Sequence, residues 1–140
     1  MTEALSLNWS KAQAASRRSA YQMALAVNLL LQLVIALTCL LAPDFVTAIF
    51  ALPPPTPSAW IRAWGAMSAL VTVLYLSGLE NPLRSRYPNI VGLLGRAWTA
   101  CVWFLIGGGL VWLGLFDLFF AVVLAWLFYR YCAAEIMSRP

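Results

Sequence analysis

The stretch that decides the fold is AWTACVWFLIGGGLVWLGLFDLFFAVVLAWLFY, residues 97–129, which carries a single charge, Asp117. One helix of this length would extend about 50 Å at ~1.5 Å per residue, whereas the hydrocarbon core of a bilayer is about 30 Å thick. The stretch therefore predicts two crossings joined by a tight reversal, which we place at residues 112–116. Asp117 then lies in the first turn of the last helix, where the helix dipole and unpaired backbone N–H groups tolerate a carboxylate.

Composition places the chain among helical integral membrane proteins. Of its 140 residues, 63% are hydrophobic and only 10% are charged, and its mean hydropathy is +0.82, whereas soluble domains are about a quarter charged. The apolar segments are long and continuous, without the alternation of barrel strands. The chain has no histidine, and Cys39, Cys101 and Cys132 stand far apart, so no haem, metal or other cofactor is expected.

We predict an all-α bundle of four transmembrane helices, at about residues 20–41, 59–79, 95–113 and 115–133. They form a transmembrane domain of residues 20–134, which follows a basic arm of residues 1–19 and precedes a short tail of residues 135–140. The loop between the first two crossings is predicted to hold a short interfacial helix at residues 44–50. Its proline-rich part, residues 53–57, is predicted to be extended, either as a rigid spacer or as a segment read by a partner.

The basic residues predict the orientation. With four crossings, both termini and the loop between the second and third crossings share one side, which then holds every basic residue except Arg62. Cytoplasmic loops carry the excess of Lys and Arg, so both termini are expected in the cytoplasm. The positive net charge therefore indicates topology and anionic headgroups rather than nucleic acid.

Small and polar residues line one face of the first crossing and part of the second. Every fourth residue of the first is small or polar: Ala20, Ala24, Asn28, Gln32 and Ala36. The second crossing carries Gly65 and Ala69 in a small-xxx-small pattern, together with Ser68 and Thr72. These faces predict either close helix packing held by side-chain hydrogen bonds or a ligand pocket, which Trp103 would flank.

The charged residues near the predicted outer ends of the helices form the candidate site. Arg62, Asp117 and Asp44 are expected to meet there, either as an ion pair that pins two helix ends or as the mouth of a functional site. Arg96 is expected to open the third crossing beside a lipid phosphate or Glu80. With Arg84 and Arg86, it forms the predicted set of headgroup contacts.

Several short motifs resemble those of small bacterial four-helix membrane proteins, including the DoxX-like and BphX-like families. They are Arg62-Ala-Trp-Gly65, Tyr75-Leu76 followed by Asn81-Pro82, Gly95-Arg96, and Asp117 at the start of the last crossing. The chain departs from them in its proline run and its long basic arm. The resemblance implies an inner-membrane protein, often an accessory to an oxidoreductase or catabolic system, and carries over no catalytic residues.

Two functions are predicted, and a third is disfavoured. The first is an accessory, anchoring or assembly module of the bacterial inner membrane, packing with itself or with a larger complex. The second is a binder or carrier of a hydrophobic small molecule, a lipid or quinone, in a pocket between helices. The sequence has no phosphate-binding loop, catalytic triad or charged relay, so an enzyme is the least favoured reading.

Overall fold

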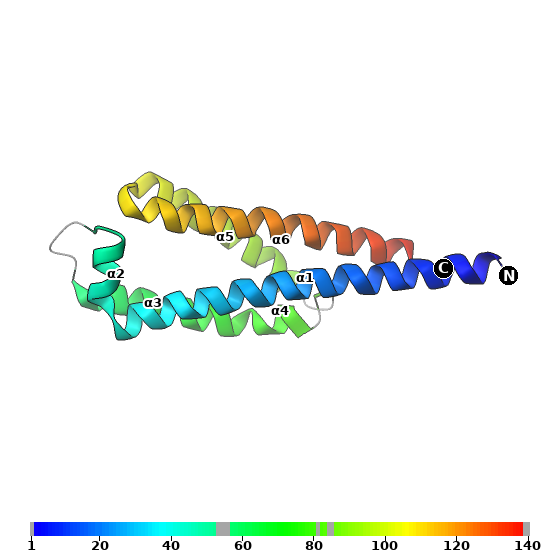
Figure 1. The fold of residues 1–140 in the computed structure, drawn as a ribbon, viewed down its shortest axis with the longest axis horizontal. Helices are drawn as coiled ribbons and strands as arrows, with labels where there is room; N and C mark the ends of the chain where they lie inside the picture. The colour runs from blue at the N-terminus through cyan, green and yellow to red at the C-terminus, as the bar shows by residue number, and fades with distance from the viewer. Residues whose placement is uncertain (1, 53–56, 81, 84–85, 139–140) are drawn as a thin grey trace.

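The computed structural model describes residues 2–52, 57–80, 82, 83 and 86–138 and, within them, is built from helices (Figure 1). In chain order these are α1 (Thr2–Leu41), α2 (Pro43–Ile49), α3 (Ser58–Leu74), α4 (Leu76–Glu80), α5 (Arg86–Ile106), the 3₁₀ turn η1 (Gly108–Leu110) and α6 (Val111–Met137). Four segments are long and apolar enough to cross a membrane: Trp9–Leu41, Ser58–Glu80, Arg86–Ile106 and Gly108–Met137. The prediction of an all-α chain with four membrane-length helices is therefore confirmed.

Prolines set the ends of the first helices. No glycine or proline interrupts α1, so the basic arm and the first crossing form one continuous helix. Ala42 precedes Pro43 and leaves the helical region, with φ at −134°, because a proline ring disfavours helical geometry in the residue before it. Pro43 then begins α2, which matches the short helix predicted after the first crossing, while residues 53–56 of the proline run lie outside the described residues.

The reversal before α6 lies earlier than predicted. Gly107 and Gly108 have φ of 77° and 61°, a region that glycine adopts freely and other residues rarely do. The prediction of a reversal at residues 112–116 was wrong because Gly114 stays inside α6, packed against Phe104, and does not break the helix. Asp117 consequently lies almost two turns inside α6 and not in its first turn.

The third helix also begins earlier than predicted, at Arg86 and not at residue 95. Pro88 falls in its first turn, where a proline removes no intrahelical hydrogen bond. The side-chain amide of Asn89 donates to the backbone oxygens of Gly78 and Pro82, at 3.2 and 3.1 Å, and so ties this start to the end of α4. Arg96 was predicted at a helix end and instead lies at the centre of α5.

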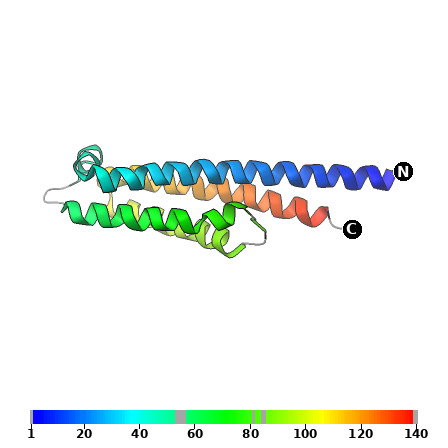
Figure 2. The same cartoon turned by 90° about the horizontal axis from the view of Figure 1, so that it is seen from below.

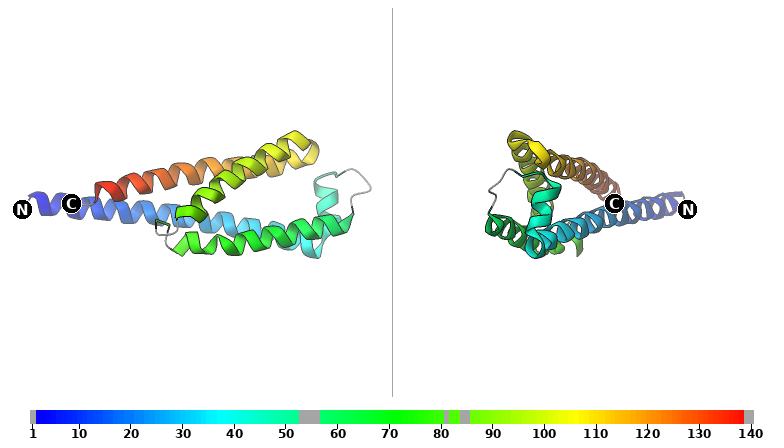
Figure 3. Two further views of the ribbon diagram at one scale, coloured as in Figure 1. Left: turned by 180° about the vertical axis from the view of Figure 1, so that it is seen from behind. Right: turned by 60° about the vertical axis from the view of Figure 1, so that its left-hand side comes forward.

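The helices form two antiparallel pairs joined through α1. α1 packs against α3 and α6, α5 packs against α6, and α3 hardly touches α5. Figure 3 shows α5 running obliquely from α4 to the start of α6, so that it diverges from α3 towards α2. Both termini lie at one end of the bundle, the terminal end, and α2 and η1 lie at the other, the α2 end (Figures 1 and 2).

Close approach and apolar packing hold these pairs together. At Gly65 an added Cβ would lie 2.7 Å from the backbone oxygen of Ala36, so the two small residues let α1 and α3 approach closely. Between α1 and α6 the core consists of buried side chains: Tyr21, Leu25, Leu29, Phe120 and Leu124. Most other large apolar side chains point outward, as expected for helices whose surroundings are lipid.

Candidate functional site

A buried charge pair lies at the middle of the bundle. Arg96 is the central residue of α5, about 15 Å from either end at ~1.5 Å per residue. Its Nη1 donates to Oδ1 of Asp117 on α6 at 3.1 Å, and the two side chains are only 8% and 17% exposed. At this depth each ion loses its hydration, so each is tolerable only because the other is present.

The guanidinium and carboxylate are held by further hydrogen bonds. Nη2 of Arg96 donates to Oε1 of Gln32 on α1, and Nε2 of Gln32 lies 3.5 Å from the backbone oxygen of Ser68 on α3. Oγ1 of Thr99 lies 2.9 Å from Oδ2 of Asp117, and the Trp103 indole interacts with the same carboxylate. The cluster therefore links α1, α5 and α6 strongly, and α3 only through one long contact.

Tyr75 covers the Arg96 side of this cluster. It lies at the break between α3 and α4 and lines the same small hollow as Arg96. Its ring lies over Gly92, where an added Cβ would be 2.8 Å from Cε1 of the tyrosine. Gly92 therefore allows the tyrosine ring to lie close against α5, one turn from Arg96.

Asn28 is the one described residue with buried side-chain atoms that lack any hydrogen-bond partner. It is 0% exposed, and neither its amide oxygen nor its amide nitrogen is paired. It lies one helical turn from Gln32 on α1. Burying an amide without a hydrogen-bond partner costs free energy of folding. No hydrogen bond within the described residues offsets this cost at Asn28.

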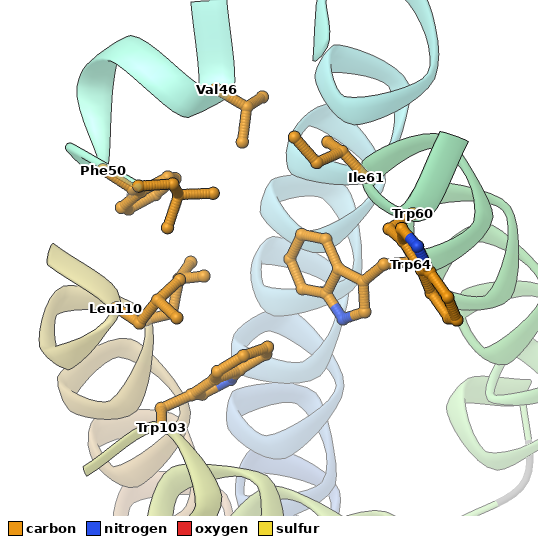
Figure 4. A pocket seen from close by; sticks show the side chains of 9 residues that line it. Val46, Phe50, Trp60, Ile61, Trp64, Trp103 and Leu110 are labelled. Carbon is orange, nitrogen blue, oxygen red and sulfur yellow. The ribbon is translucent and has the colours of Figure 1, made fainter. Parts of the chain in front are cut away.

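An apolar cavity of about 160 Å³ adjoins the polar cluster at the α2 end. Figure 4 shows the side chains of α2, α3, α5 and η1 facing a common space. Trp64 and Trp103 meet edge to face there, with ring centroids 5.6 Å apart, and so connect the diverging helices α3 and α5. The lining residues are Val46, Phe50, Leu52, Trp60, Ile61, Trp64, Trp103, Leu110 and Leu113.

Trp103 belongs to both sites. Its ring lines the cavity, and the same side chain interacts with the carboxylate of Asp117. Trp103 therefore connects the cavity with the charge pair.

The structure brings some of the predicted site residues together and separates others. Gln32, Ser68, Trp103 and Asp117 meet in the cluster, and Thr72 lies one turn along α3, where it donates to the oxygen of Ser68 at 2.8 Å. The predicted partner of Asp117 was Arg62, but the carboxylate pairs with Arg96. Arg62 and Asp44 are exposed at the α2 end.

Neither Arg62 nor Asp44 forms an ion pair with any residue that the structure describes. Arg62 and Asp44 lie apart from Asp117 because the chain reverses earlier than predicted. Asp117 is therefore inside α6, at the level of Arg96, and not at a helix end.

The three residues predicted to contact lipid headgroups lie in different environments. Arg84 lies outside the described residues, and Arg86 is exposed at the start of α5. Arg96 is not a headgroup contact or a partner of Glu80, because it is buried against Asp117. The backbone oxygen of Glu80 instead accepts from Arg18 at 3.0 Å.

Two residues of the cluster, Thr99 and Tyr75, were not predicted. Thr99 and Trp103 follow Arg96 at spacings of three and seven residues, which puts all three on one helix face. This signal was present in the sequence, but it emerges only when the helix is known to begin before Arg96. Tyr75 carries no such signal, since its position depends on the break between α3 and α4.

Both charged groups of the pair are held by donors and acceptors from three helices. Among the described residues, no group of three cysteine, aspartate or glutamate side chains gathers as metal ligands would. Comparison with protein-family models, curated proteins and solved structures finds no match.

Proposed function

We propose that the protein binds a membrane-dissolved hydrophobic small molecule, a lipid or quinone, in the cavity between α2, α3, α5 and η1. One observation carries this proposal: the tryptophan-lined cavity shares Trp103 with the buried charge pair. The charge pair holds the Trp103 side of the cavity in place. The other lining side chains are mostly apolar and offer a ligand contact area that requires no hydrogen bonds.

The size of the cavity defines the part of the ligand that it takes. A dry, apolar cavity of roughly 150 Å³ binds a single benzene ring, and this one measures about 160 Å³. It therefore suits one ring or one branched alkyl unit, with the rest of the molecule in the lipid beside α3 and α5. α3 and α5 diverge towards α2 (Figure 3), which is where the cavity lies.

The accessory-module hypothesis has less support from the geometry. Its predicted mechanism is docking through the Ala and Gly faces and the proline-rich outer loop, of which residues 53–56 lie outside the described residues. Ala36 and Gly65 are buried against each other within one chain, so this part of the small-residue face is not available to a partner. Association with itself or with a larger complex becomes an outcome of the experiment below.

The membrane and orientation that we propose follow from the charge distribution. The basic residues of α1 and α6 lie towards the terminal end, at Lys11, Arg17, Arg18 and Arg130, while the α2 end carries Arg62 alone among the described basic residues. By the positive-inside rule, both termini are cytoplasmic. The bacterial inner membrane, which the resemblance to DoxX-like and BphX-like proteins implies, is the membrane we propose.

The test is the binding of a decyl-substituted benzoquinone to the purified full chain in mild detergent. Quenching of tryptophan fluorescence gives the dissociation constant, and native mass spectrometry gives the stoichiometry. Leu113→Phe places a larger side chain in the cavity and is expected to weaken binding by about tenfold or more. Leu118→Phe, an exposed position on the same helix, is the matched control and should bind as the wild type does.

The outcomes separate the hypotheses. Ile61→Phe fills the cavity from α3 and repeats the test should Leu113→Phe not fold. Equal affinity in the cavity-filling and control variants, or no binding to the wild type, would overturn the proposal. A stoichiometric oligomer without a retained small molecule would favour the accessory module in its place.

A further inference from the structure

A basic groove lies far from the cavity, between α1 and α6 at the terminal end. Two adjoining hollows, of about 480 and 230 Å³, share Gln13, Arg17 and Arg130. Among the side chains that the structure describes, no acidic residue lines either hollow, and Ser16 and Trp9 complete the polar and aromatic lining of the larger one. The groove therefore presents two guanidinium groups, from two different helices, to the same space.

The position of these arginines along the bundle is that of a membrane–water boundary. The last aromatic layer of the core is the contact of Tyr21 with Phe128, whose ring centroids are 5.3 Å apart. Arg17 lies one turn before Tyr21, and Arg130 lies two residues after Phe128, so each is about 3–6 Å beyond this layer. Trp9, which is exposed, suits the headgroup region that lies next along the helix.

The side chain of Arg130 is held in place without a counter-charge. Its Cζ lies 4.6 Å from the ring centroid of Trp126, a cation–π contact that leaves the guanidinium N–H groups free for an anion. Neither Arg130 nor Arg17 forms an ion pair with any residue that the structure describes. Both arginines therefore have unused capacity for a charged acceptor.

The opposite side of the same helix pair provides the contrast. A hollow of about 410 Å³ there is lined by Lys11, Arg18 and also Glu135. Its acidic residue offsets part of the positive charge, so an anion is attracted less strongly. The two grooves thus have the same helices and a similar number of basic residues but a different charge balance.

We propose that Arg17 and Arg130 bind the phosphate of an anionic phospholipid headgroup in the groove between α1 and α6. Arginine forms charge-assisted hydrogen bonds to phosphate oxygens, and Gln13 and Ser16 offer donors for headgroup hydroxyls. The lipid tails lie along the apolar surface of α6 beyond Leu127. This site is separate from the proposed cavity and stands without it.

The experiment is native mass spectrometry of the full chain in mild detergent with added lipids of identical acyl chains. Phosphatidylglycerol is compared with phosphatidylcholine, and the retained lipid per chain is counted. Each basic residue near an anionic lipid contributes about fivefold to its binding. We therefore expect retention of one phosphatidylglycerol in preference to phosphatidylcholine, and loss of this preference in the Arg17→Gln/Arg130→Gln variant.

The control removes the same charge from the opposite groove. Lys11→Gln/Arg18→Gln should keep the preference, and circular dichroism shows whether each variant is folded. An equal loss in both variants would mean diffuse attraction to a basic surface and would overturn the proposal, as would a preference that survives in Arg17→Gln/Arg130→Gln. Displacement of the lipid by millimolar inorganic phosphate would overturn the lipid assignment and identify a site for free phosphate.

Discussion

Asp117→Asn tests the charge pair on which the bundle is centred. The substitution keeps the shape of the side chain but leaves Arg96 without a counter-charge at a place where it is 8% exposed. Removing one partner of a buried pair costs about 3–5 kcal/mol. Because the new amide still offers Arg96 one acceptor, we expect the lower end, about 3 kcal/mol, which lowers the folded-to-unfolded ratio about 100-fold.

The assay is equilibrium unfolding by sodium dodecyl sulfate in mixed micelles, followed by tryptophan fluorescence and circular dichroism. A double-mutant cycle then identifies the partner. Arg96→Gln alone is expected to destabilise the chain as Asp117→Asn does, and the double variant should lose less than the sum, with a coupling of about 1–3 kcal/mol. The corresponding cycle with Arg62→Gln should give a coupling below about 0.5 kcal/mol.

Two results would refute this reasoning. If Asp117→Asn costs no more than Asp44→Asn, an exposed position expected to change stability by less than about 0.5 kcal/mol, the pair does not hold the bundle together. If Asp117 couples to Arg62 as strongly as to Arg96, the reversal lies where the sequence first suggested, and the helix register given above is wrong.

Three further substitutions probe the surroundings of the pair. Gly92→Ala should destabilise the chain by about 1–2 kcal/mol, because its Cβ would come within 2.8 Å of Tyr75. Gly95→Ala, whose Cβ would be 3.7 Å from the same side chain, should be neutral or slightly stabilising by its helix propensity; thermal unfolding of both in detergent makes the comparison. Asn28→Leu should raise the free energy of unfolding by about 1 kcal/mol, since it removes an unpaired buried amide, and a loss of stability would show that the amide has a partner in the membrane-embedded protein.

The sequence predicts the class of fold because hydrocarbon thickness limits each crossing. Residues 97–129 are too long for one helix and must reverse, and the four apolar segments are readable for the same reason. The prolines at residues 43 and 57 mark the helix ends nearest to them, since proline restricts its own backbone and that of the residue before it. These are local effects, which one sequence is sufficient to show.

The helix register in the second half of the chain could not be predicted in this way. When each helix is considered by itself, a charge inside the membrane is unfavourable, so Arg96 and Asp117 are both predicted at helix ends, on opposite sides of the membrane. In the structure each is tolerated because the other faces it, and that is a property of two helices together. A one-helix argument therefore misplaces both, and it also gives Asp117 the wrong partner.

The position of the pair explains why the cavity lies where it does. Arg96, Asp117 and Gln32 fasten α5 and α6 to α1, whereas α3 meets this cluster only through a backbone oxygen at 3.5 Å. The boundary between α3 and α5 can thus widen without separating the charge pair. A ligand in the proposed site would displace apolar contacts there, while the charge pair keeps α5 and α6 fixed to each other.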